Sequence, residues 1–268
     1  MSINFKSLLI DLARSAGLIV KSKLHSLSSR DIICRSVDDV TRRIDLEIEN
    51  YVIEKIRSEN VDSIVLTEER GMVRIGEYPK YIFIIDPLDG SLNFTLKIPY
   101  YTISIAVANY RENSTLSDIF AGIVYDISRD TIYYADNYEI INLEKLSVEL
   151  EKPVISLYSN FDEKTLLKLS RLYKILESFK VRTLGSASLE MVMSVKNVFS
   201  AFLDVRGKLR IYDIAASYII AKKCRTIVLN PNGQSLDHVK LFEKPRLNIL
   251  MTNNEDIARK IIDVFRGE

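Results

Sequence analysis

The segment DPLDGS at positions 86–91 places two carboxylates three positions apart, directly after the apolar run 81–85. Two ionised carboxylates at the edge of a hydrophobic core repel each other and need a partner. Hard divalent cations such as Mg²⁺ take oxygen ligands from carboxylates and backbone carbonyls. Asp86, Asp89 and the Leu88 carbonyl between them therefore form a candidate metal site.

Gly90 and Ser91 follow the second carboxylate and are typical of a tight turn that opens a helix. Glycine permits backbone conformations that other residues disfavour. The free N–H groups at the start of a helix favour an anionic group such as phosphate. The segment therefore predicts a phosphate site next to the metal site.

Further acids stand where other elements begin or end. Glu68 and Glu69 follow a predicted strand at 62–66, Asp45 lies near the start of a predicted helix at 41–59, and Asp213 opens another helix. Acids at a helix start are commonly caps or partners of the helix dipole, and a glutamate pair beside an arginine is commonly a solvated surface. The residue types alone leave both the structural and the chemical role open at each position.

Hydrophobic periodicity predicts the elements that would position these residues. Helices are expected at 4–25, 41–59, 163–179 and 254–265, with two more beginning near Gly185 and at Asp213. Short apolar runs predict strands at 31–35, 62–66, 81–85, 101–109, 119–125, 131–135, 153–159, 180–184, 199–205, 226–230 and 247–251. The three runs between 101 and 135 favour an antiparallel meander. The polar segment 70–79 is expected to be a mobile loop, either a cover of the site or a plain connection.

Composition narrows the class of protein. The chain has 268 residues, 47% of them hydrophobic, and a net charge of +1, which argues against a nucleic-acid partner. Two cysteines without metal or redox spacing fit a reducing compartment, so a cytoplasmic location is expected. Two histidines are too few for a histidine-based zinc cluster, and no uncharged apolar run is long enough to span a membrane. The charged, irregular segment 136–153 suggests subdomains at 1–143 and 144–268.

The order of TEE at 67–69, DPLDGS at 86–91, GSAS at 185–188 and YDIAAS at 212–217 resembles the inositol monophosphatase superfamily. That superfamily includes fructose-1,6-bisphosphatases and nucleotide 3′-phosphatases. The segments DVTRRID at 39–45 and DVRGKLRIYD at 204–213 look most like the archaeal-type enzymes that act on both inositol monophosphate and fructose bisphosphate. The resemblance implies an α+β fold, a layered αβαβα sandwich, and commonly a homodimer.

The resemblance also implies a role for each matching residue. Two or three Mg²⁺ ions, with Mn²⁺ as a substitute, would be held by Glu68, Asp86, the Leu88 carbonyl, Asp89 and Asp213. Asp45 would help to hold a further ion near the attacking water, which Glu69 and Ser91 would orient or deprotonate. The phosphate would bind at Asp89, Gly90 and Ser91. The sugar or cyclitol would contact Arg182, Gly185, Ser186, Ala187 and Arg206.

Three positions depart from the family pattern. Thr67 stands where glycine is usual, Ser91 replaces the commoner threonine but keeps the hydroxyl, and Ser217 stands where glycine usually follows the paired alanines. The last change is expected to alter helix packing more than chemistry.

The expected mechanism is hydrolysis without a covalent enzyme intermediate. Positions 86 and 89 have Asp-x-x-Asp spacing, whereas the haloacid-dehalogenase phosphatases use Asp-x-Asp, and no Ser-His-Asp or Cys-His set is evident. The expected reaction is therefore attack of a metal-activated water on a phosphate monoester. A nucleotide phosphatase acting on 3′-phosphoadenosine 5′-phosphate and a non-catalytic protein that keeps the fold are the alternatives.

Overall fold

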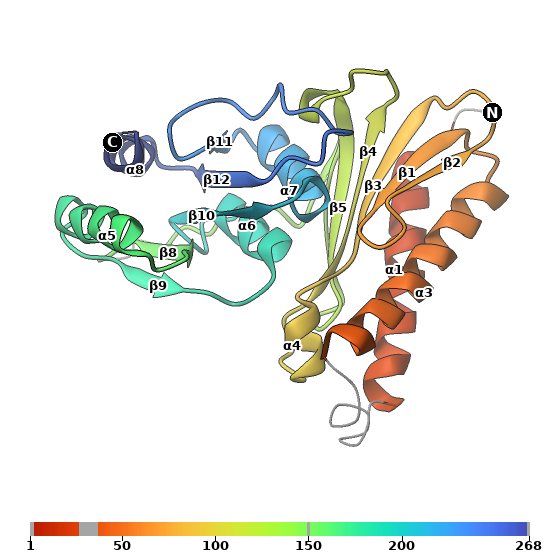
Figure 1. Ribbon diagram of the computed structural model, residues 1–268, viewed down its shortest axis with the longest axis horizontal. Coiled ribbons are helices and arrows are strands. Elements are labelled where there is room, and N and C mark those ends of the chain that lie inside the picture. Colours follow the sequence, from red (N-terminus) through yellow and green to blue (C-terminus); the bar gives the residue numbers. More distant parts are fainter. Residues whose placement is uncertain (1–2, 27–36, 149–150, 267–268) are drawn as a thin grey trace.

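Helices and sheets alternate in five layers in the computed structural model, which describes residues 3–26, 37–148 and 151–266 (Figure 1). The outer helices α1 (Phe5–Ser26) and α3 (Val37–Ser58) pack on one face of the first sheet. Their buried face is aliphatic, with Leu9, Leu12, Ile48 and Val52 fully buried. The predicted αβαβα sandwich is confirmed.

The first sheet has seven strands in the order β2-β1-β3-β4-β5-β6-β7. The strands are β1 (Ser63–Thr67), β2 (Met72–Ile75), β3 (Tyr81–Asp89), β4 (Thr102–Asn109), β5 (Ile119–Asp126), β6 (Thr131–Ala135) and β7 (Ile140–Ile141). Strands β1 and β3 are parallel, so their carboxyl ends meet at one edge. Strands β4, β5 and β6 form the predicted antiparallel meander. A short 3₁₀ helix, η1 (Leu116–Asp118), precedes β5.

The middle layer consists of α6 (Ala187–Val195) and α7 (Ile211–Lys223), which share a core with both sheets. Helix α7 approaches β5 closely at Gly122, where an added Cβ would lie 2.8 Å from the carbonyl oxygen of Ala216. The small side chains Ala215, Ala216 and Ser217 make this approach sterically feasible, as their size predicts.

The second sheet has the order β11-β12-β10-β8-β9. Its strands are β8 (Val154–Tyr158), β9 (Lys180–Arg182), β10 (Ala201–Leu209), β11 (Ile227–Leu229) and β12 (Leu247–Thr252). Helices α5 (Glu163–Ile175) and α8 (Glu255–Phe265) cover its outer face. The short helix α4 (Ser91–Thr95) extends from the end of β3 (Figure 1). No helix among the described residues has the length and apolarity needed to cross a membrane.

Several predicted boundaries were wrong. The segment 70–79 is not simply a loop: Met72–Ile75 forms β2, which pairs antiparallel with β1, and its inward side chain Ile75 is buried. Strand β10 continues past the predicted end at 205 and so includes Arg206. The predicted strand 31–35 lies outside the described residues. The division into subdomains at 1–143 and 144–268 stays a prediction. Residues of α6 and α7 share one core with residues of both sheets.

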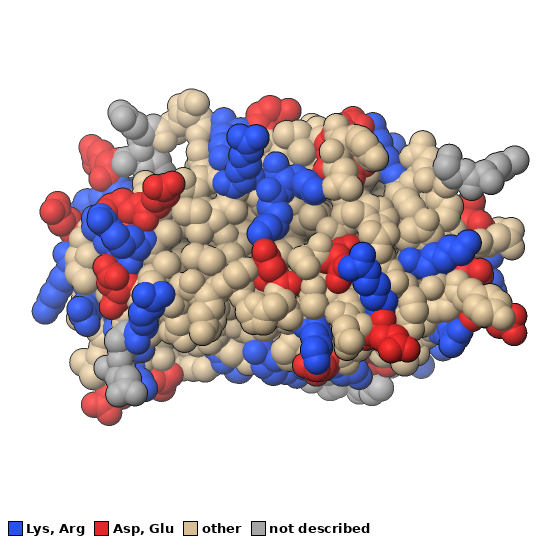
Figure 2. Space-filling model, turned by 90° about the horizontal axis from the view of Figure 1, so that it is seen from above, with Lys and Arg blue, Asp and Glu red and all other residues tan. Residues whose placement is uncertain are grey.

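Charged side chains of both signs are interspersed over the face seen in Figure 2. Neither sign covers that face, as the net charge of +1 would suggest.

Candidate active site

The parallel pair β1 and β3 brings the two central acidic motifs together. Thr67 pairs with Ile85 in the ladder, so Glu68, which follows the end of β1, and Asp86, which continues β3, come next at the same edge of the sheet. The ladder between β3 and β4 then shifts register between Asp86 and Asp89. One extra residue on β3 makes a bulge, and a bulge re-aims side chains at a strand end.

Asp86 is at the centre of the acidic group. It is 4% exposed, and burial raises its pKa, with further increases from the charges of Asp89, Asp213, Glu68 and Asp45. Burial also raises the pKa of Asp213 to about 6, although Arg210 opposes this. These five carboxylates are therefore near enough to one another for their charges to repel.

Asp45 lies well inside α3, eight residues after its first residue, so the explanation of Asp45 as a helix cap was wrong. It is 8% exposed, and its Oδ1 is buried without a hydrogen-bond partner among the described residues. Burial and the charges of Glu68, Glu49 and Glu69 raise its pKa to about 8. A buried, unpaired carboxylate oxygen in an acidic group fits a cation ligand.

Arg210 supplies a positive charge to the acidic group. Its Nη2 lies 2.5 Å from Glu68 Oε1 and 3.5 Å from Asp213 Oδ1. Burial opposes the charge on Arg210, but Asp213 and Glu68 together outweigh it and raise the pKa of the guanidinium. Arg210 is also the N-cap residue of α7, and its N–H donates to Asp213 Oδ2 at 2.6 Å. Asp213 is therefore the third residue of the helix and accepts the cap N–H, which corrects its prediction as the N-cap.

Asp89 joins the acidic edge to the start of α6. Its Oδ2 accepts hydrogen bonds from the Ser186 hydroxyl and from both the N–H and the hydroxyl of Ser188, while Oδ1 accepts one from the N–H of Ala187. A carboxylate has about four acceptor sites, so Oδ1 keeps a lone pair for another partner.

Asn93 ties α4 to the turn before α6. Its Nδ2 donates to the carbonyls of Tyr100 at 2.8 Å and Leu184 at 2.6 Å. Gly90 has φ +91°, and an added Cβ would lie 3.2 Å from the carbonyl oxygen of Gly185. Glycine is required at position 90 because of this conformation and this close approach. The contacts place the predicted phosphate and substrate segments beside each other.

The acidic group offers carboxylate oxygens from four segments, and the Asp45 Oδ1 among them has no hydrogen-bond partner among the described residues. Oxygen atoms of this kind are the ligands that Mg²⁺ prefers. Among the described residues, however, no three acidic, histidine or cysteine side chains form a ready cluster of ligands. The contacts explain why: Glu68 pairs with Arg210, Asp89 faces α6, and Asp86 Oδ1 accepts the N–H of Leu88 at 3.2 Å. The assignment of individual ligands, including the Leu88 carbonyl, stays a prediction.

Glu49 was not identified from the sequence. This fully buried residue of α3 accepts the N–H of Glu69 on Oε1 and that of Arg70 on Oε2, both at 3.0 Å. It therefore anchors the turn that carries Glu68 and Glu69. The signal that could have revealed it is its i+4 spacing from Asp45, which places a second acid on the same face of the helix.

Glu190 was missed as well. It is fully buried in α6 and accepts the Ser156 hydroxyl, the Tyr158 hydroxyl and the N–H groups of Leu184 and Gly185. The carboxylate therefore fixes the turn that precedes Ser186. A lone glutamate in an apolar helix was the available signal, but its partners come from β8 and the turn after β9.

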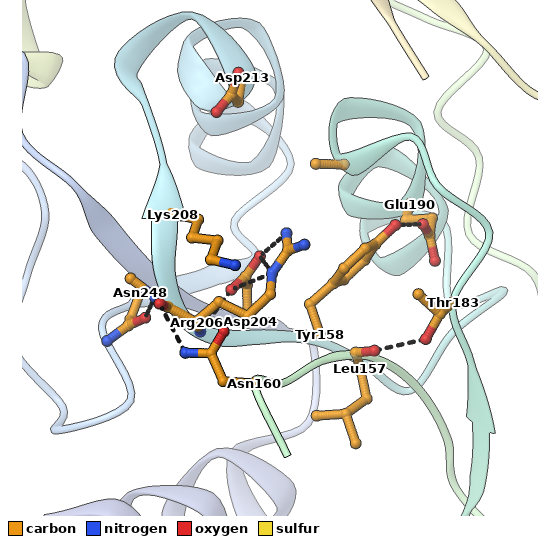
Figure 3. Close-up of polar contacts among 12 residues, drawn as sticks. Leu157, Tyr158, Asn160, Thr183, Glu190, Asp204, Arg206, Lys208, Asp213 and Asn248 are labelled. Carbon is orange, nitrogen blue, oxygen red and sulfur yellow. Dashed lines mark hydrogen bonds and ion pairs between the residues drawn. The ribbon is translucent and has the colours of Figure 1, made fainter. Parts of the chain in front are cut away.

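Arg206 is connected to the turn before Ser186 by the side chain of Tyr158, which lies between them. Its guanidinium pairs with the buried Asp204 at 2.6 Å and lies 4.3 Å from the centroid of the Tyr158 ring. The Tyr158 hydroxyl donates to Glu190 and accepts the N–H of Gly185 at 2.9 Å. Figure 3 shows Arg206 and Asp204 on one side of Tyr158, with Glu190 at its hydroxyl end.

Arg182 is not brought to this network. It is exposed on the edge strand β9, and among the described residues its guanidinium donates to the carbonyl of its neighbour Val181. Gly185 and Ser186 lie at the entry of α6, as predicted; Ser186 is the N-cap and Ala187 the first residue of the helix. Ser91 is the first residue of α4, with Gly90 as its N-cap. The roles of these residues in substrate binding and catalysis stay predictions.

Comparisons with known proteins identify the family and the fold of the chain. The model of the "Inositol monophosphatase family" matches residues 4–266. A fructose-1,6-bisphosphatase/inositol-1-monophosphatase of Archaeoglobus fulgidus is 34% identical over 84% of each chain. A bifunctional NADP phosphatase/NAD kinase of Methanocaldococcus jannaschii is 31% identical over 84% of this chain, which spans only 44% of that relative.

The fold matches solved structures across nearly the whole chain. Inositol monophosphatase II of Staphylococcus aureus superposes with a TM-score of 0.75 at 22% identity, covering 99% of this chain and 98% of that one. The inositol monophosphatase-fructose 1,6 bisphosphatase MJ0109 gives a TM-score of 0.73 at 23% identity, covering 98% and 100%. At these identities the superpositions show a shared fold.

Proposed function

Because this chain belongs to the inositol monophosphatase family, we propose that it is a Mg²⁺-dependent phosphoric monoester hydrolase. The observation that carries the proposal is the convergence of Glu68, Asp89, Asp213 and Asp45 around the buried Asp86. Burying this much negative charge is costly unless a cation compensates it. Two or three Mg²⁺ ions, with Mn²⁺ as a substitute, would compensate it, held by these carboxylates and the Leu88 carbonyl.

Bound Mg²⁺ would supply stabilisation of charge on the phosphoryl oxygens and a lowered pKa of bound water. The chain itself does the positioning. Glu69, whose N–H is held by Glu49, and the hydroxyl of Ser91 would orient the attacking water, and the Glu69 carboxylate would accept its proton. Gly90 and Ser91 begin α4, so their backbone N–H groups would hold phosphate oxygens.

The alcohol part of the substrate would lie against the entry of α6. Gly185, Ser186 and Ala187 are fixed there by Glu190 and Asp89. Arg206 would contact substrate hydroxyl groups from the far side of Tyr158, and Arg182 would require a side-chain rearrangement to join it. The substrate class proposed is a small phosphorylated sugar or cyclitol, with inositol monophosphate and fructose 1,6-bisphosphate first.

A nucleotide phosphatase is the second candidate. It is favoured by the relatives named as bifunctional NADP phosphatase/NAD kinase, of which this chain spans slightly less than half. The phosphate of NADP, or that of 3′-phosphoadenosine 5′-phosphate, would then occupy the same acidic site. The third reading is a protein that keeps the fold without catalysis.

Phosphate release separates these candidates. We expect the wild type with Mg²⁺ to release phosphate from inositol 1-phosphate or fructose 1,6-bisphosphate, and Asp89→Asn to be strongly impaired. Preferred release from NADP or 3′-phosphoadenosine 5′-phosphate would favour the nucleotide phosphatase. No release from any of these substrates would favour the non-catalytic protein, and undiminished release by Asp89→Asn would show that the site is misassigned.

The chain is also proposed to form a homodimer in the cytoplasm. Leu92 in α4 and Leu96 and Ile98 just after it are 58%, 58% and 45% exposed, and such apolar side chains favour a protein interface. Light scattering after gel filtration would test the dimer: we expect twice the mass of one chain, and a monomer at all concentrations would contradict it.

A further inference from the structure

A cavity of about 660 Å³ lies beside the acidic site, between the β1–β2 hairpin, the start of α7 and the segment 241–246. Its volume is within the usual range for small-molecule sites. None of the residues predicted to bind metal lines it. The cavity is therefore a separate space that shares a wall with the site, and Arg210 is part of that wall.

The lining combines aromatic rings with cations. Tyr110, Tyr212 and Phe242 contribute rings, and the Tyr110 and Phe242 rings meet edge to face at 6.3 Å between centroids. Flat ligand rings pack well against such a wall. The positive charges come from Arg74, Arg210, Lys244 and Arg246, whereas Glu112 is the acid among the described lining residues.

The cationic side chains of the lining differ in whether they already have hydrogen-bond partners in the protein. Arg74 donates to the carbonyl of Gly76, and Arg246 donates to the carbonyl of Lys208 at 2.9 Å. Lys244 makes no hydrogen bond or ion pair with any described residue, and it is exposed at the cavity rim. Its ammonium is therefore available for an anionic group of a ligand.

We propose that this cavity binds a small aromatic anion, a planar ring with a carboxylate or phosphate group, and that this binding favours Mg²⁺ binding at the acidic site. The ring would lie among the aromatic side chains, and the anionic group would pair with Lys244 and Arg210. Nucleoside monophosphates and aromatic carboxylates share this chemistry.

Arg210 provides the coupling. Its guanidinium contacts Glu68 and Asp213, the same carboxylates that Mg²⁺ would need. An anion in the cavity would offer Arg210 another partner and so release these carboxylates. Coupling between two sites is reciprocal, so Mg²⁺ would in turn strengthen binding of the aromatic anion. The coupling rests on the proposed metal site, whereas binding in the cavity does not.

Calorimetry on metal-free protein tests the cavity first. The probes are AMP for the nucleotide class and indole-3-acetate for the carboxylate class. Adenosine, which lacks the phosphate, and inorganic phosphate, which lacks the ring, are measured for comparison. We expect at least one probe to bind once per chain and Lys244→Asn to weaken it about tenfold or more; asparagine suits the left-handed backbone of position 244, where φ is +51°. Lys152→Asn, an exposed charge outside the cavity, is the matched control. Equal binding by the two variants, or no binding of either probe, would overturn the site.

Titration of Mg²⁺ with and without the bound probe tests the coupling. We expect saturating probe to tighten Mg²⁺ binding about fivefold or more in the wild type, within the usual range of coupling between sites, and not in Arg210→Met. Unchanged Mg²⁺ affinity in the wild type would overturn the coupling. Failure of the proposed enzyme activity would leave probe binding to metal-free protein intact, so the two failures are distinguishable.

Discussion

Arg210 Nη2 lies 2.5 Å from Glu68 Oε1, so a guanidinium pairs with one of the carboxylates that are predicted to bind metal. The same arginine lies 3.5 Å from Asp213 Oδ1. An internal cation lowers the repulsion among buried carboxylates in the absence of metal. Mg²⁺ and Arg210 should therefore compete for these two acids.

Replacing Arg210 by methionine tests this competition. We expect Arg210→Met to lower the unfolding free energy of the metal-free protein by about 1–3 kcal/mol, because its charged hydrogen bonds are lost. The stabilisation by Mg²⁺ should increase, since no internal cation competes. Thermal unfolding with EDTA and with Mg²⁺ measures both quantities. Arg171→Met, on the exposed face of α5, is the control, and an equal Mg²⁺ effect in both variants would contradict the competition.

Glu49 should act through the turn that it anchors. We expect Glu49→Gln to weaken Mg²⁺ binding roughly 10- to 100-fold, as is common when a group that orients metal ligands is changed. The reason is that an amide cannot accept both N–H groups of Glu69 and Arg70 as the carboxylate does. Calorimetric titration measures the affinity. Glu47→Gln, on the exposed side of the same helix, should leave it unchanged; a matching loss there would argue against a specific role of Glu49.

Glu190 should affect substrate binding more than chemistry. In Glu190→Gln, the amide cannot replace all the acceptor sites now used by Leu184, Gly185 and Tyr158. An unsatisfied buried donor costs about 1–3 kcal/mol, so we expect lower stability and a raised KM with a smaller change in kcat. Steady-state kinetics and urea unfolding measure these effects. If Glu190→Gln lost stability but kept its KM, the turn would not serve substrate binding; Glu163→Gln, exposed at the start of α5, is the control.

The stability of the metal-free protein should depend on pH through Asp45. Burial and neighbouring acids raise its pKa to about 8 in the folded chain, against about 3.9 when unfolded. Between about pH 4 and 8 the folded chain then holds a proton that the unfolded chain lacks, so stability falls as pH rises through that range, by up to about 1.4 kcal/mol per pH unit.

Urea unfolding at several pH values in EDTA measures this slope. Asp45→Asn should flatten it, and saturating Mg²⁺ should do the same because the cation stabilises the ionised carboxylate. A slope that persists unchanged in Asp45→Asn would assign the effect to other groups.

Part of the site could be predicted because Glu68, Asp89 and Asp213 lie at the ends of elements. The apolar runs before Glu68 and before Asp86 predict two strands, and their parallel pairing then brings the acids together. Strand β2 was missed because glycines and charged residues surround its short alternation of side chains. Glu49, Glu190 and Arg210 were missed for another reason: their roles depend on partners distant in the chain, and periodicity carries no information about such pairs.

The most direct test of the proposed Mg²⁺-dependent hydrolysis is phosphate release from inositol 1-phosphate and fructose 1,6-bisphosphate as a function of Mg²⁺ concentration, with wild type and Glu68→Gln side by side. We expect no release in excess EDTA, saturable activation of the wild type by Mg²⁺, and a Glu68→Gln variant that needs much more Mg²⁺ or stays inactive. Wild-type release that continues undiminished in excess EDTA would contradict it.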